Sequence, residues 1–72
     1  MKSNEFKQNG KYKVKTVNCD GKARGRLWEL GVKEGTVFKV EKATSYFVLI
    51  DVYGTLIAIS DEIISKIGVE NA

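Results

Sequence analysis

The fold is decided by residues Gly21–Val40, which read GKARGRLWELGVKEGTVFKV. In the first half of this stretch, Ala23, Leu27 and Leu30 recur at intervals of four and three residues, the period of one apolar helix face. Gly31 follows directly, at the position where a helix end takes a left-handed residue. The pattern predicts a short helix that ends at Gly31.

The second half of the stretch returns to extended chain. Gly35 can adopt a positive φ and therefore suits a tight turn. Phe38 and Val40 then alternate with charged residues, which is the period-two pattern of a half-buried strand. The sequence thus predicts helix, turn and strand in direct succession.

Strand-like alternation covers most of the remaining chain. The predicted strands are residues 11–19, 36–43, 46–53, 55–60 and 68–69, with a helix at 22–30 and a helical turn at 61–67. Asp20 and Ser60 are the expected N-terminal caps of the two helical segments, and Gly54 is the expected hairpin tip. Five short strands cannot bury their faces as a flat sheet. We therefore expect a mainly β fold, a small SH3-like barrel with one short helix between the first two strands and a helical turn before the last.

The length of 72 residues suits one domain over residues 1–72, in which residues 1–9 are a loose N-terminal segment. Cys19 is the only cysteine, so an intrachain disulfide is excluded, and a reducing compartment is favoured. No apolar run has the length of a signal peptide or a membrane span. We expect a soluble, cytoplasmic chain.

The net charge of +3 is unevenly distributed. Residues 1–26 carry eight basic and two acidic side chains, whereas residues 27–72 carry four basic and seven acidic ones. The basic half can meet an acidic protein surface, a membrane headgroup layer or nucleic acid. A lysine-rich strand face that is merely solvated is the alternative, because exposed charges need no partner.

The side chains that carry catalysis are nearly absent. The chain has no histidine, so neither Cys19 nor any serine has an imidazole base, and we expect no enzymatic activity and no catalytic residues. Cys19 and Asp20, with Glu29 or Glu34, are the only grouping that suggests a transition-metal site, and it needs water or a second protein to be complete. We expect no resident cofactor and no dedicated metal residues, with Cys19 packed as a small hydrophobic residue.

The predicted hairpin is apolar on both faces. Val48 and Ile50 lie on one face of its first strand, and Phe47 and Leu49 lie on the other. We expect the helix and the N-terminal segment with Phe6 to cover the second face. The alternative is that part of this face receives a partner.

Two groups of residues give the chain a family resemblance. The first group is Gly21, Arg26, Leu27, Leu30, Gly31, Gly35, Thr36 and Val40, and the second is Ile50, Val52, Gly54, Ile57, Ala58 and Ile59. Over nearly its whole length, the chain resembles the FeoA family, small cytosolic proteins of bacterial ferrous-iron uptake. The resemblance implies an SH3-like fold and a non-catalytic accessory role beside FeoB, a membrane transporter with a cytosolic GTP-binding domain. It also implies a link to transition-metal handling, here at most a weak or shared contact with Fe²⁺.

A partner surface is predicted on the flanks of the helix. Trp28 and Arg24 fall on one flank and Arg26 on the other, and Trp and Arg are enriched in interface hot spots. The expected partner-binding residues are Arg24, Arg26, Trp28, Glu29 and Tyr53. In the alternative arrangement, Trp28 folds over the barrel as a lid.

Two further partners remain open at this stage. A basic barrel can bind single-stranded nucleic acid by stacking bases on Tyr12, Tyr46 or Tyr53, although acidic groups interrupt the later strands and stable binding is not expected. An uncovered hairpin edge can also pair two copies of the chain as a homodimer.

Overall fold

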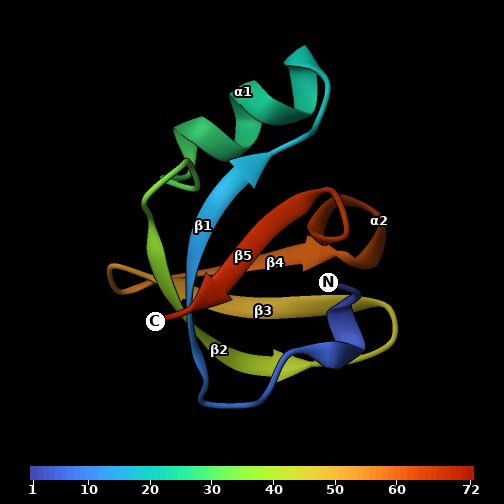
Figure 1. Cartoon of the computed structure of the whole chain (residues 1–72), viewed down its shortest axis with the longest axis vertical. Coiled ribbons are helices and arrows are strands. Elements are labelled where there is room, and N and C mark those ends of the chain that lie inside the picture. The colour runs from blue at the N-terminus through green and yellow to red at the C-terminus, as the bar shows by residue number, and fades with distance from the viewer.

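A computed structural model describes all 72 residues. The elements, in chain order, are a 3₁₀ turn η1 (Ser3–Glu5), β1 (Lys11–Val17), α1 (Gly21–Glu29), β2 (Val37–Ala43), β3 (Phe47–Val52), β4 (Thr55–Ser60), α2 (Asp61–Ile64) and β5 (Ile67–Asn71) (Figure 1). The strands form one antiparallel sheet in the order β4-β3-β2-β1-β5. The predicted architecture is confirmed: mainly β, with five strands, a helix between β1 and β2 and a helical turn before β5.

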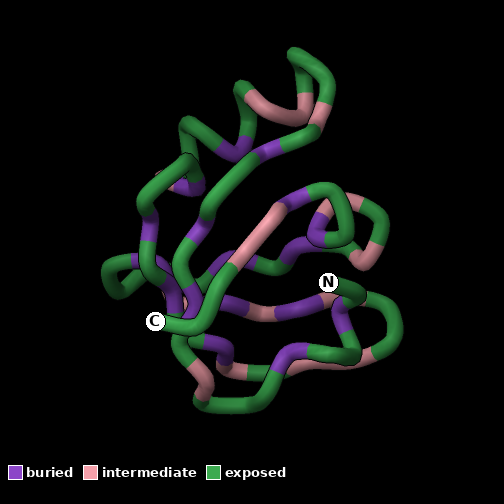
Figure 2. The backbone as a smooth tube through the Cα atoms, viewed as in Figure 1, coloured by how far each residue is buried: buried purple, intermediate pink, exposed green.

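The core lies inside the curled sheet and is built by alternation along each strand. On β3, Val48, Ile50 and Val52 are buried, and the residues between them are half-buried. Figure 2 shows the same alternation of buried and more exposed backbone along the strands. Because α1 adds only Leu27 to the fully buried set, the helix covers one end of the core and leaves its other side chains exposed or half-buried.

The N-terminal segment packs against the rest of the chain, which corrects the expectation that residues 1–9 are loose. The Ser3 N–H donates to Asp61 Oδ1 at 2.8 Å, and the Ser3 hydroxyl donates to the Thr44 carbonyl oxygen at 2.6 Å. Phe6 is buried, and its ring meets the Tyr12 ring edge to face with centroids 4.8 Å apart. These contacts join η1, α2 and the β2–β3 loop on one side of the molecule (Figure 1).

Phe6 was expected to cover the second face of the hairpin. In the structure it fills the core instead. Its ring centroid lies 6.2 Å from that of Phe38, and both residues belong to the buried core cluster. On the outer side of β3, Phe47 and Leu49 remain half-buried. The reason is that only a residue on the inner side of the sheet can share the core with Tyr12 and Phe38.

The predicted ends of α1 are confirmed. Asp20 Oδ1 accepts the N–H of Ala23 at 3.1 Å, which satisfies one of the free amides of the first turn. Gly31 has a φ of 90°, in the left-handed region that favours glycine. The Val32 N–H then donates to the Leu27 carbonyl oxygen at 2.8 Å, and Val32 is buried. This closure sends the chain from α1 into the turn before β2.

Candidate partner-binding site

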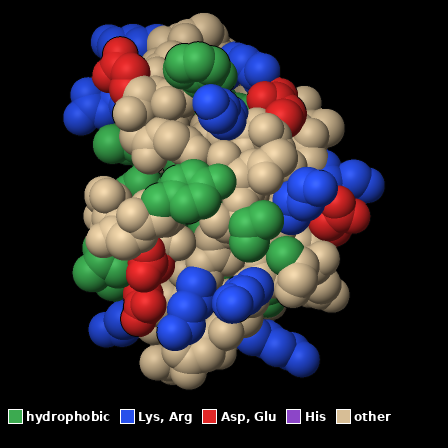
Figure 3. All heavy atoms as spheres, turned by 90° about the vertical axis from the view of Figure 1, so that its left-hand side faces the viewer, with side chains coloured by type: hydrophobic (Ala, Val, Ile, Leu, Met, Phe, Trp, Pro, Cys, Tyr) green, Lys and Arg blue, Asp and Glu red, His purple; other side chains and the backbone are tan.

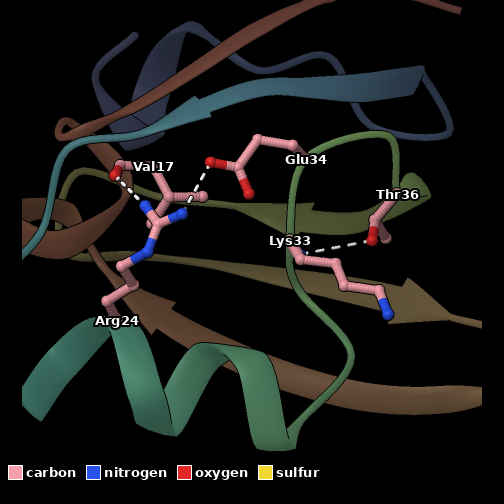
Figure 4. Close-up of polar contacts among 5 residues, drawn as sticks. All are labelled: Val17, Arg24, Lys33, Glu34 and Thr36. Carbon is pink, nitrogen blue, oxygen red and sulfur yellow. Dashed lines mark hydrogen bonds and ion pairs between the residues drawn. The ribbon is translucent and has the colours of Figure 1, made fainter. Parts of the chain in front are cut away.

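The turn between α1 and β2 is held by a buried hydroxyl. Thr36, 3% exposed, donates from Oγ1 to the Gly31 carbonyl oxygen at 2.8 Å. The same oxygen accepts the Lys33 N–H at 3.2 Å (Figure 4). One side chain thereby satisfies a donor and an acceptor that the turn would otherwise leave unpaired. The turn is fixed relative to the helix it follows.

Arg24 ties the helix to its surroundings. Its Nη1 donates to the Val17 carbonyl oxygen at 2.6 Å, and its Nη2 forms an ion pair with Glu34 Oε2 at 2.8 Å (Figure 4). The hydrogen bond from Arg24 lowers the pKa of the Glu34 carboxyl below its ordinary value. Arg24, expected to face a partner, is thus engaged within the chain, where it braces α1 against the end of β1 and the turn.

Trp28 stands out from the helix into solvent. Its side chain is 58% exposed, so the lid arrangement is wrong. The Lys33 Nζ lies 4.5 Å from the centroid of the Trp28 ring, within the range of a cation–π contact. The sequence did not indicate this contact, because the two residues belong to the helix and to the turn beyond it. The result is an exposed aromatic ring with an ammonium group beside it.

Arg26 lies on the other flank, where a groove separates α1 from β4. The groove has a volume of about 370 Å³. Its lining consists of Ala23, Arg26 and Leu27 from α1, the C-cap residue Leu30, Ile57–Ser60 from β4, and Ile63 from α2. Leu30 is 43% exposed, although it shares the apolar stripe with the buried Leu27. β4 is an edge strand, so no further strand pairs with the side that faces away from β3.

Tyr53 occupies the tip of the β3–β4 hairpin. It is 82% exposed and has a φ of 51°, and Gly54 follows with a φ of 90°. Two successive positive φ values are typical of a primed hairpin turn. The Gly54 N–H donates to Asp51 Oδ1 at 2.7 Å and holds the turn. Glu29, the last residue of α1, is exposed and forms no ion pair in the structure.

The five predicted partner-binding residues therefore do not form one cluster. Trp28 and Arg24 share one flank of α1, Arg26 lines the groove on the other, and Tyr53 marks a separate turn. The predicted turn glycines are confirmed by their backbone angles, with φ values of 90° at Gly31 and Gly54 and 93° at Gly35. The signal that sequence analysis missed is Lys33, whereas the β4 edge is the hairpin edge considered for pairing two copies of the chain.

The residues considered for metal binding have other contacts. Cys19 is half-buried and packs against the core, as expected. Asp20 caps α1, and Glu34 is paired with Arg24. No group of three or more His, Cys, Asp or Glu side chains comes together in a metal-binding arrangement.

The tyrosines considered for base stacking do not form a continuous platform. Tyr12 is 5% exposed and belongs to the core, which corrects its inclusion in such a surface. Tyr46 and Tyr53 are both exposed, but one precedes β3 and the other follows it, so the length of the strand separates them.

Comparison with known proteins decides the family. The FeoA domain matches residues 1–71. The chain belongs to the FeoA domain family. Among curated proteins, no sequence matches this FeoA chain.

Solved FeoA structures share the fold. An iron uptake regulatory protein (FeoA) superposes with a TM-score of 0.87 at 20% identity, over 100% of this chain and 97% of that one. The FeoA protein of Chlorobium tepidum gives a TM-score of 0.83 at 24% identity, over 99% and 70% of the two chains. Iron(II) transport protein A of Clostridium thermocellum gives 0.89 at 15% identity, over 100% of this chain and 46% of the other. The predicted SH3-like FeoA fold is thereby confirmed. Neither α1 nor α2 has the length and apolar character that a membrane-spanning helix needs.

Proposed function

We propose that this FeoA-family chain binds the cytosolic GTP-binding part of a FeoB-like ferrous iron transporter and regulates it without chemistry of its own. The observation that carries the proposal is the pair of surfaces on α1, the exposed Trp28 on one flank and the open groove on the other. An accessory protein without a catalytic site acts through contact with another macromolecule. The helix offers that contact on both sides.

Trp28 is suited to anchor such a complex. A large exposed ring that becomes buried on docking contributes apolar area, and Trp is the residue type most enriched at interface hot spots. Lys33 beside the ring supplies a positive charge that favours an acidic group on the partner. Glu29 at the helix end and Arg26 on the opposite flank provide further charged groups for orientation.

The groove fits an extended segment of the partner. One wall is an edge strand with free backbone groups, which can pair with an added strand. The other wall is apolar, and there Leu27 of α1 and the C-cap residue Leu30 can receive alternate side chains. Arg26 is the only charged residue in the lining and favours a carboxylate near the end of that segment.

The test is capture of the transporter's purified cytosolic domain by Trp28→Ala and by Arg26→Glu. We expect each variant to unfold at the wild-type urea concentration and to bind at least tenfold more weakly, on the order of the loss typical of a hot-spot residue. Tyr46→Ala is the matched control, because this aromatic residue is 83% exposed and lies at the far end of β3. Folded Trp28 and Arg26 variants that bind like the control would refute the proposal.

A further inference from the structure

A second surface lies on the outer side of the sheet beside the hairpin tip. It is a hollow of about 230 Å³ lined by Lys11, Val37, Phe38, Lys39, Asp51, Tyr53 and Gly54. The strand register explains its composition, since Lys11 lies directly opposite Lys39, and Lys13 lies directly opposite Val37. We call Lys11, Lys39, Val37 and Tyr53 the hairpin-tip face. It belongs to β1, β2 and the β3–β4 turn, and it shares no residue with the groove beside α1.

The lysines of this face form no ion pair, although Lys39 lies directly opposite Asp51 on β3. The one ion pair of the structure joins Arg24 and Glu34, so neither Lys11 nor Lys39 has a carboxylate within ion-pair distance. Like charges directly opposite each other on neighbouring strands are destabilising. Asp51, which also lines the hollow, accepts the Gly54 N–H and is thereby oriented toward the turn. An anionic group placed between the lysines would relieve their repulsion.

Apolar side chains protrude beside these charges. Tyr53 is 82% exposed and Val37 is 40% exposed, and Leu56, across from Asp51 on β4, is 60% exposed. Figure 3 shows hydrophobic side chains interspersed with charged ones, with more Lys and Arg than Asp and Glu, on the side of the molecule that carries the turns. Single apolar groups between basic ones suit a boundary where a lipid phase meets water. A protein interface instead needs a contiguous apolar centre.

The backbone at Tyr53 adds an independent argument. Its φ of 51° is one that asparagine and glycine adopt at much lower cost than tyrosine. An aromatic residue in an unfavourable conformation at an exposed tip points to recognition rather than to packing. Tyrosine is among the residues enriched at the level of lipid headgroups.

We infer that the hairpin-tip face binds the surface of an anionic phospholipid bilayer, with a headgroup phosphate between Lys11 and Lys39 and the Tyr53 ring at headgroup level. This goes beyond the proposed function, because contact with lipid needs no transporter. Charge complementarity selects the lipid class: each lysine near an anionic surface strengthens adsorption by about fivefold.

The test is co-sedimentation with vesicles of phosphatidylcholine alone and of phosphatidylcholine mixed with phosphatidylglycerol. We expect binding only to the mixed vesicles, weakened by added salt. Lys11→Gln combined with Lys39→Gln should lower the partition coefficient by roughly 25-fold. Lys42→Gln combined with Lys66→Gln removes the same net charge from other parts of the surface and is the matched control. An equal loss in both double variants would overturn the inference.

Insertion of the tip is measured separately. In a Trp28→Phe background, Tyr53→Trp places the only tryptophan at the tip, and its emission should shift to the blue with mixed vesicles. Tyr46→Trp in the same background is the control and should not shift. An unshifted Tyr53→Trp variant would overturn the inference. The inference would also be overturned if the wild-type protein bound neither vesicle type, or if it bound single-stranded oligonucleotides in preference to vesicles.

Discussion

The two sides of the barrel are closed in different ways. On one side, Ser3 bonds to both Thr44 and Asp61, so that three segments far apart in the sequence hold one another. On the other side lie the α1–β2 and β3–β4 turns (Figure 1), each held by its own local bonds. Trp28 of α1 and Tyr53 of the β3–β4 turn are both exposed. The difference teaches that polar contacts can seal one side of a small barrel and leave the other free to bind.

The largest effect is expected in the sealed side. Phe6→Ala empties a buried site between Tyr12 and Phe38 and should lower the free energy of unfolding by ~3–5 kcal/mol. Trp28→Ala, the matched aromatic truncation on the open side, should change it by no more than about 0.5 kcal/mol. Urea denaturation followed by circular dichroism measures both. Equal losses of unfolding free energy in the two variants would show that the two sides do not differ in their contribution to stability.

The next effect tests how the open side keeps its shape. Thr36→Val retains the volume of the side chain but removes the hydroxyl that serves Gly31 and Lys33, which should cost about 1–3 kcal/mol. Thr36→Ser keeps the hydroxyl and is the control. If the valine variant unfolds at the same urea concentration as the serine variant, the hydroxyl bonds do not hold the turn.

A smaller effect on stability, which depends on the pH, is expected at Asp61. The bond from the Ser3 N–H lowers the pKa of this carboxyl in the folded protein below its ordinary value. The resulting stabilisation is present above the ordinary aspartate pKa and is lost as the pH falls through the lowered value. Asp61→Asn should therefore be less stable than the wild type at neutral pH and equal to it in acid. A stability difference that persists in acid would assign the effect to something other than charge.

The smallest effect has the opposite sign. Tyr53→Asn places at a φ of 51° a residue that tolerates it and forms the Asn-Gly pair that primed turns prefer. We expect a gain of about 0.5–1 kcal/mol in the free energy of unfolding, in the range of other backbone-compatible turn substitutions. Thermal unfolding is the measurement. A destabilised variant would show that the Tyr53 ring contributes to the fold.

Sequence analysis succeeded where structure depends on neighbours along the chain. The caps at Asp20 and Ser60, the left-handed Gly31 and the alternation along β3 follow from short-range patterns, and all are present. The Ser3–Asp61 bond spans 58 positions and leaves no local trace. For this reason the N-terminal segment was expected to be loose.

The candidate site was less predictable for a similar reason. Helical periodicity places Leu30 on the same stripe as Leu27, but it does not say how far the helix extends past the core. In the structure α1 ends at Glu29 and Leu30 is its C-cap residue, so Leu27 is buried and Leu30 lines an open groove. The exposed state of Trp28 depends on the same geometry.

The Lys33 ammonium group over the Trp28 ring has a consequence for the thermodynamics of docking. An unrestrained indole on a helix surface samples several rotamers and loses that freedom when it is captured. Here the lysine already favours one orientation. Association should therefore be less opposed by entropy than for a bare tryptophan, and calorimetry of a Lys33→Met variant would show this as a less favourable entropy of binding.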